Sequence, residues 1–189
     1  KLKSQEINPL DFFPHHVGDL WQYFNHTQAG SEFWERKITA IDTLLSDSSI
    51  VFIENVRNSI NISHKIFFND SLIVYWKPLG STDWSPRYVF NALINDYWYS
   101  NPFSQWYTKY INESSELIFE DTLLFREYWT APDTTFILPL FTERLALGIG
   151  FYYSEYEVGI TELIGCIVNG IQYGTIINVE DENENSHPS

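Results

Sequence analysis

The sequence contains little of several residue types on which common functions depend. Among 189 residues there is one cysteine and no methionine, and 11 Lys and Arg residues stand against 25 Asp and Glu residues. A single cysteine excludes an internal disulfide and a CxxC metal or redox site. The formal charge of −14, with no basic cluster to offset it, argues against nucleic acid and anionic membranes as partners, because both repel an acidic surface.

Long apolar runs are also missing. No segment reaches the roughly 18 consecutive apolar residues of a membrane-spanning helix, so the sequence predicts a soluble protein with no membrane span. Methionine is absent even from position 1, which predicts a processed product whose leader has been removed. Cys166 lies in the apolar run Leu163–Val168. We therefore predict that it is a small buried hydrophobic residue and not a nucleophile.

Aromatic residues, in contrast, are abundant, with seven Trp, twelve Tyr and fourteen Phe. Aromatic side chains suit the pleated, half-buried surface of a sheet, which favours a mainly β protein. The length fits one domain. We expect a polar, extended lead-in over residues 1–10, a single β-domain over 11–178, and an acidic, solvated linker over 179–189.

Short apolar runs broken by turn residues predict the strands of this domain. Residues 21–24 and 33–40 form an expected opening pair around a polar turn at 25–31. Tight hairpins are expected at Asn69-Asp70 and at Glu120-Asp121, since Asn and Asp tolerate the positive φ that such turns require. Repeated hairpins predict an antiparallel meander that forms a barrel-like or sandwich domain with little helix.

Residues 86–98 allow two interpretations. Ser85-Pro86 followed by apolar residues at helical spacing indicates a helix of about three turns. An internal repetition favours a turn and a strand instead, because Val17-Gly18-Asp19-Leu20-Trp21 and Ile94-Asn95-Asp96-Tyr97-Trp98 share an apolar residue, Gly or Asn, Asp, any residue and Trp. We favour the turn and strand.

Several motifs together resemble a known group of proteins. The opening Phe12–Tyr23 has the pattern apolar-Pro-x-x-x-Gly-Asp-x-Trp-x-Tyr, and Phe90-Asn91-Ala92 with Asn95–Trp98 resembles the group's turn in mid-chain. Ala146–Gly150 and the close Asn169-Gly170-Ile171-Gln172-Tyr173-Gly174 complete the set. These residues resemble uncharacterised secreted bacterial β-proteins of the kind that the type IX secretion system exports, although a Gly-Thr-Phe motif common in mid-chain is missing.

This resemblance implies a β-fold, export with a cleaved leader, and an extracellular or cell-surface location. It also implies that the acidic segment 179–189 links the domain to a C-terminal sorting domain beyond Ser189. It implies no activity.

Four Asp-Ser/Thr dipeptides resemble the O-glycosylation sites of bacteria with this secretion system. The residues that would carry the glycan are Thr43, Ser71, Thr122 and Thr134. The alternative is that these dipeptides only mark turns.

Catalytic and metal motifs are sparse. His15-His16 is the only histidine pair, and adjacent side chains of an extended chain point in opposite directions, so we interpret the pair as a surface turn and predict no metal site and no cofactor. Acidic residues are plentiful enough to supply a paired-carboxylate site of the glycosidase type. The candidates from neighbouring strands are Glu120, Asp121, Glu127, Glu143, Glu155, Glu157 and Glu162.

The aromatic stretch Tyr97–Tyr110 and the nearby Trp84 are the strongest candidates for a binding surface. Rings interleaved with amide and hydroxyl side chains suit stacking on sugars or on a protein partner. We select Trp84, Trp106 and Tyr107 as candidate ligand-binding residues and expect Trp98 to belong to the core. The alternative is that all of these rings fill a β-core.

Two functions remain open from the sequence. The first is a non-catalytic secreted or cell-surface module, structural or binding, whose partner is a glycan, another protein or a further copy of itself. The second is an extracellular glycan hydrolase that uses paired carboxylates.

Overall fold

The computed structural model describes residues 8–44, 49–56, 60–67, 72–77, 81–101 and 104–178. These residues form one short 3-10 helix and thirteen strands, and every strand pair is antiparallel. The elements are η1 (Pro9–Phe12), β1 (Leu20–Thr27), β2 (Gly30–Leu44), β3 (Ser49–Val56), β4 (Ile60–Phe67), β5 (Ile73–Trp76), β6 (Ser85–Val89), β7 (Tyr97–Asn101), β8 (Trp106–Ile118), β9 (Asp121–Ala131), β10 (Phe141–Ala146), β11 (Gly150–Tyr156), β12 (Gly159–Val168) and β13 (Ile171–Gly174). The prediction of a mainly β, antiparallel, barrel-like domain is confirmed.

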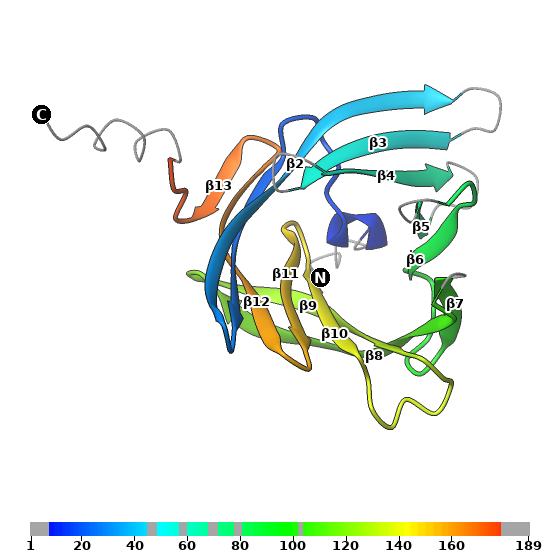
Figure 1. Ribbon diagram of the computed structural model, residues 1–189. Helices are drawn as coiled ribbons and strands as arrows, with labels where there is room; N and C mark the ends of the chain where they lie inside the picture. The colour runs from blue at the N-terminus through cyan, green and yellow to red at the C-terminus, as the bar shows by residue number, and fades with distance from the viewer. Residues whose placement is uncertain are drawn as a thin grey trace, which may run out of the picture.

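The strands form a single sheet in the order β6-β5-β4-β3-β2-β1-β12-β11-β10-β9-β8-β7, and β13 pairs separately with β12. The chain therefore forms two meanders of six strands each, which β1 and β12 join along a ladder from Leu20↔Ile167 to Thr27↔Gly159. The sheet curves into a barrel shape, so that its two end strands, β6 and β7, come to lie next to each other (Figure 1).

The same turn opens each of the two meanders. Gly18 and Asn95 take positive φ angles of 95° and 79°, and the carboxylates of Asp19 and Asp96 each accept a hydrogen bond at 2.8 Å from the backbone N–H three residues earlier. The chain then enters β1 or β7. The sequence repetition thus marks a structural repetition.

Residues 86–98 form the end of β6, a turn and the start of β7, so the helical interpretation is wrong. The apolar residues that suggested a helix face are not buried together, since Leu93 is 74% exposed and Ile94 is 53% exposed. Pro86 lies on an end strand of the sheet, where a missing N–H does not interrupt a ladder on both sides.

Two of the predicted turns lie at slightly different residues in the structure. The hairpin of β8 and β9 has its tip at Phe119-Glu120, one residue before the expected Glu120-Asp121, and Phe119 takes the positive φ of 56°. The strands β1 and β2 extend to Thr27 and Gly30, which shortens the expected turn at 25–31. The hairpin expected at Asn69-Asp70 and the linker 179–189 lie outside the described residues.

The segment before β1 fills one end of the barrel. Pro9 and Leu10, which belong to the expected extended lead-in, form the first half of η1. Phe12 is fully buried; its ring stacks on Phe90 at a centroid distance of 6.2 Å and lies under the guanidinium of Arg126 at 4.7 Å. In Figure 1, η1 lies inside the ring of strands. We call residues 8–16 the plug.

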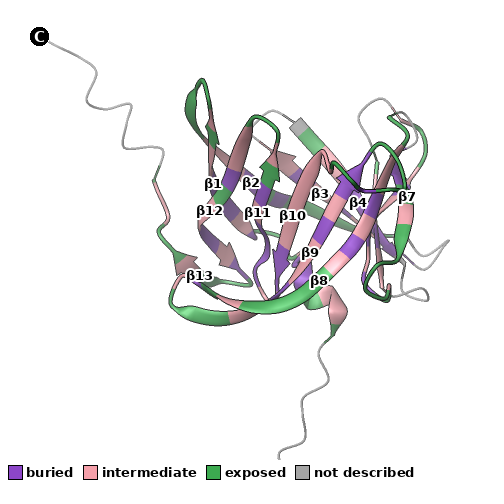
Figure 2. Ribbon diagram, turned by 90° about the horizontal axis from the view of Figure 1, so that it is seen from below, coloured by how far each residue is buried: buried purple, intermediate pink, exposed green. Residues whose placement is uncertain are grey.

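The interior is aromatic, and it also contains charge. Buried positions alternate with more exposed ones along the strands around this interior, as Figure 2 shows. Glu54 of β3 accepts two hydrogen bonds from Arg36 of β2 through Oε1, at 2.9 and 2.6 Å, and its Oε2 lies 3.1 Å from Nε2 of His64 in β4. All three side chains are buried. A buried carboxylate and guanidinium need each other, since either alone would be uncompensated.

The pKa values of this group follow from burial and pairing. Burial alone would raise the pKa of Glu54, but the charge of Arg36 and the contact with His64 lower it well below its usual range. Burial lowers the pKa of His64, and the hydrogen bond to Glu54 offsets this only in part. His64 is therefore neutral at pH 7.

Cys166 behaves as the sequence predicts. It is fully buried in the core, and burial raises the pKa of its thiol to about 12. Since the thiolate is the nucleophilic form, this cysteine is a small hydrophobic core residue.

We predict that Phe12→Ala destabilises the protein by about 3–5 kcal/mol, the usual cost of removing a buried phenylalanine ring. The measurement is the free energy of unfolding in urea. Leu93→Ala, which removes an exposed side chain, serves as the control and should change that free energy by less than about 0.5 kcal/mol. An effect of Phe12→Ala as small as that of the control would contradict the role of the plug in the core.

We also predict that stability falls as pH drops below about 6.5, the ordinary pKa of histidine. Below that value the unfolded chain takes up a proton at His64 and the folded chain does not, so the free energy of unfolding decreases by at most about 1.4 kcal/mol per pH unit for this group. His64→Gln keeps a donor for Glu54 and does not titrate.

The check is the free energy of unfolding between pH 7.5 and 5. It should fall less steeply in His64→Gln than in the wild type, and His26→Gln, which changes an exposed histidine of β1, should follow the wild type. Equal slopes for His64→Gln and the wild type would refute the prediction.

Candidate functional site

The candidate site is a cleft formed by two adjoining cavities. The first, of about 190 Å³, lies between the two end strands of the sheet, and we call it the seam cavity; it is lined by Trp76, Arg87, Ser100, Asn101, Trp106, Thr108, Thr130, Phe141 and Glu143. The second, of about 330 Å³, we call the mouth cavity. Arg87, Phe141 and Glu143 line both cavities, so the two are lobes of one cleft.

The mouth cavity opens at the end of the barrel opposite the plug. Its lining includes Asn25 near the end of β1, Val56 at the end of β3 and Tyr156 at the end of β11. Near the plug lie Asp19, just before β1, Ile50, the second residue of β3, and Gly148, just before β11. The plug therefore closes one end of the interior, and the cleft occupies the other.

The seam exists because β6 and β7 do not pair. They are the ends of the strand order, and in the described part of the chain no ladder joins them. The indole Nε1 of Trp76 in β5 donates a hydrogen bond across the seam to the carbonyl oxygen of Ser100 in β7, at 3.1 Å. Each end strand also carries a β-bulge, whose extra residue is Arg87 in β6 and Ser100 in β7. Bulges redirect side chains and blunt sheet edges, and both of these extra residues line the seam cavity.

The floor of the seam cavity is a row of hydroxyl groups. Thr108 of β8 donates a hydrogen bond to the hydroxyl of Ser100 at 2.8 Å, and its oxygen lies 3.1 Å from the hydroxyl of Thr130 in β9. All three side chains are buried. Ser100 in turn donates to the carbonyl oxygen of Trp106 at 3.3 Å. Each hydroxyl carries one proton, and Thr108 donates its own to Ser100, so Thr130 is the donor to Thr108 and the row offers a ligand acceptor lone pairs.

The walls of the cleft are aromatic. Trp106 of β8 packs against Phe141 of β10 with ring centroids 5.4 Å apart, and Phe141 packs against Tyr156 of β11 at 6.4 Å. Trp76 lies on the seam side, with the guanidinium of Arg87 5.8 Å from its ring centroid. Rings thus follow the cleft from the seam to the mouth.

The charges of the cleft balance one another. Arg87 lies 3.5 Å from Oε1 of Glu143, and the hydroxyl of Tyr88 donates to Oε2 of the same carboxylate at 3.2 Å. Burial opposes the charge on Arg87, yet Tyr88 and Glu143 raise its pKa overall. The Arg36–Glu54 pair lines the mouth cavity as the second ion pair.

The three residues selected from the sequence lie in three different places. Trp106 lines the seam cavity. Tyr107, the next residue, points to the opposite face of β8, where its ring packs against Tyr97 at 6.2 Å and Tyr99 at 5.3 Å. Trp84 precedes β6, and the ammonium of Lys65 lies 5.7 Å from its ring centroid. The expected common surface of Trp84, Trp106 and Tyr107 therefore does not form, since strand neighbours alternate between faces.

Sequence reasoning missed most of the cleft. Trp76, Arg87, the three hydroxyl residues and Phe141 come from six different strands, and no local pattern joins them. Glu143 was one of seven equivalent acidic candidates. Trp106 is the cleft residue that the aromatic stretch did indicate. Trp98, which we expected in the core, packs on Tyr128 at 6.1 Å against the core.

Three of the four residues predicted to be O-glycosylated lie in the described part of the chain, and all three are exposed to solvent. These are Thr43, Thr122 and Thr134, whereas Ser71 lies outside the described residues.

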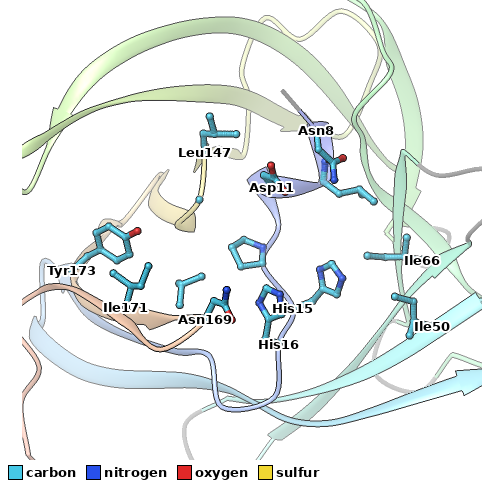
Figure 3. A pocket seen from close by; sticks show the side chains of 14 residues that line it. Asn8, Asp11, His15, His16, Ile50, Ile66, Leu147, Asn169, Ile171 and Tyr173 are labelled. Atoms are coloured by element: carbon cyan, nitrogen blue, oxygen red, sulfur yellow. The ribbon is translucent and has the colours of Figure 1, made fainter. Parts of the chain in front are cut away.

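A further cavity, of about 610 Å³, lies beside the plug, with Ile50, Ile66, Leu147 and Ile171 among its walls (Figure 3). Two of the polar residues that line it, His16 and Asn169, take part in a contact that holds the fold together. The carboxylate of Asp19 accepts hydrogen bonds from the backbone N–H groups of His16 at 2.8 Å and Asn169 at 2.7 Å, and so fastens the plug to the end of β12. We therefore take the seam and mouth cavities as the candidate site.

The histidine pair is oriented differently from the prediction. The rings of His15 and His16 stack in parallel, with centroids 5.8 Å apart and an interplanar angle of 3°, and both line the cavity beside the plug. Alternation applies to strands, and this segment lies in the plug before β1.

A metal-binding cluster and a membrane-spanning helix are both absent from the described residues. No group of three or more His, Cys, Asp or Glu residues is placed to hold a metal ion there. Among the same residues no helix has the length and apolar character to cross a membrane.

No family model and no curated protein matches this chain. Among solved structures, one similar protein comes from Bacteroides fragilis, has a YmcC-like fold and is inferred to be exported; it is 10% identical, with a TM-score of 0.46 over 80% of this chain and 96% of that one. Another, an inferred lipoprotein of Parabacteroides distasonis, is 13% identical, with a TM-score of 0.42 over 84% of this chain and 98% of that one. Similarity of this degree identifies neither ligand nor location, so the function rests on the cleft.

Proposed function

We propose that this protein is a non-catalytic binding module that holds a neutral saccharide in the cleft. The observation that carries the proposal is the combination of aromatic walls with a floor of hydroxyl groups and internally paired charges. Sugar rings present apolar C–H faces, which suit the rings of Trp106, Phe141 and Tyr156, and hydroxyl edges, which suit Ser100, Thr108 and Thr130.

The charge balance favours a neutral ligand. The cleft carries two guanidinium groups, Arg36 and Arg87, and two carboxylates, Glu54 and Glu143, and each guanidinium is paired with a carboxylate. A charged ligand group would have to displace one partner and leave the other buried and unpaired, which is costly. A neutral polar ligand can accept from one member of a pair and donate to the other without separating them.

The same pairing supports binding over hydrolysis. A glycosidase needs a carboxyl group that gives up a proton, and such a group normally has a raised pKa. Arg36 and His64 lower the pKa of Glu54, and its two oxygens are occupied by these neighbours. Glu143 likewise has Arg87 and Tyr88 at its two oxygens. Neither carboxylate therefore has an oxygen without a protein partner, and Glu54 is arranged to keep its charge.

The proposal includes the location. The sequence motifs at 12–23 and 169–174 resemble those of secreted bacterial proteins, and this supports a secreted or cell-surface protein, with type IX export as the finer form. The test is fractionation of the source cells with an antibody against this domain. Protein confined to the cytoplasm would reject the location without affecting the binding proposal.

We predict that Trp106→Ala weakens saccharide binding by about tenfold, equivalent to about 1.4 kcal/mol, because it removes one wall of the cleft. A glycan array first identifies a neutral saccharide that binds the wild type, and calorimetric titration then gives the affinity of each variant.

Tyr107→Ala is the matched control, since it removes the neighbouring ring on the opposite face of the same strand. It should leave the affinity unchanged, and thermal melts of both variants establish that they are folded. If no neutral saccharide binds, or if Tyr107→Ala reduces the affinity as much as Trp106→Ala does, the proposed cleft is rejected.

A further inference from the structure

We infer that the ligand is an internal stretch of a linear oligosaccharide, which enters at the mouth and leaves through the seam between β6 and β7. This inference rests on the proposed function and adds the shape and direction of the ligand. It distinguishes a chain binder from a lectin that holds a single terminal sugar.

The connection of the two lobes is the first argument. Arg87, Phe141 and Glu143 line both the seam and the mouth cavity, so the two lobes adjoin at these three side chains. The two lobes are lined by different parts of the fold: the mouth cavity by strand ends such as that of β11 at Tyr156, and the seam cavity by residues of the two end strands of the sheet.

The seam itself is the second argument. At the other junction of the two meanders, β1 and β12 are joined by a continuous ladder. At β6 and β7 the bulges at Arg87 and Ser100 place side chains into the gap. The hydrogen bond across the gap runs from Trp76 to the carbonyl oxygen of Ser100, so the hydroxyl of Ser100 stays bonded to Thr108. One hydrogen bond thus bridges the seam, and polar and aromatic side chains line the cavity beside that bond.

The distribution of rings is the third argument. The seam lobe has Trp76 and Trp106, the mouth lobe has Trp34 and Tyr156, and Phe141 lies between the lobes. A single sugar ring needs one such platform. Platforms at successive positions suit successive units of a chain, as aromatic residues do along grooves that bind single-stranded nucleic acids.

The experiment uses the neutral saccharide found by the array, as a series from the single sugar to the hexamer of the same repeat. Calorimetric titration measures the affinity of each for the wild type, Trp106→Ala in the seam lobe, Tyr156→Ala in the mouth lobe and Tyr107→Ala as control. For the wild type we expect affinity to rise by about tenfold or more from the single sugar to the longer chains.

The decisive result is the pattern across variants. The longest chain should lose affinity by about tenfold in both lobe variants, whereas the single sugar should lose affinity in only one of them. An affinity that does not rise with chain length, or a long chain that is weakened by only one lobe variant, would overturn the inference and leave the saccharide cleft standing. Absence of any saccharide binding would instead reject the proposed function itself.

Discussion

The ladder between β1 and β12 is the constraint on which the rest of this structure depends. It joins two strands that are more than a hundred residues apart in sequence, from Leu20↔Ile167 to Thr27↔Gly159, and so unites two six-stranded meanders in one sheet. Because strands twist, a sheet of this width curls. Its two ends, β6 and β7, then meet on the far side, and the curvature encloses an interior that must be filled.

How the interior is filled determines where a ligand can bind. The plug brings Phe12 and Phe13 into one end, where they form part of the aromatic core. The other end receives charged and hydroxyl side chains from strands on both sides of the seam. Burying them is tolerable because Arg36 is paired with Glu54, and Arg87 with Glu143. The same pairing that makes these groups compatible with folding leaves polar atoms along an aromatic cleft.

The same local turn precedes β1 and β7, but these two strands differ in how they pair. Each meander begins with this turn, built on Gly18-Asp19 or on Asn95-Asp96. The strand that follows the first turn pairs on both sides, with β2 and β12, whereas β7 pairs with β8 alone among the residues that the structure describes. The turn is a local feature, and the free edge is a consequence of ring closure.

Alternation, turn chemistry and apolar runs within a few residues were enough to predict the strand class, the repeated turn and the burial of Cys166, and they placed the hairpin of β8 and β9 to within one residue. The sequence also singled out Trp106, yet it grouped that residue with Tyr107, which a strand sends to the opposite face. Only the tertiary structure decided that β6 and β7 would meet without pairing, and that Arg87, Ser100 and Glu143 would share one cleft. Those contacts depend on the curvature of the whole sheet and on bulges in its end strands, which no local pattern of residues records.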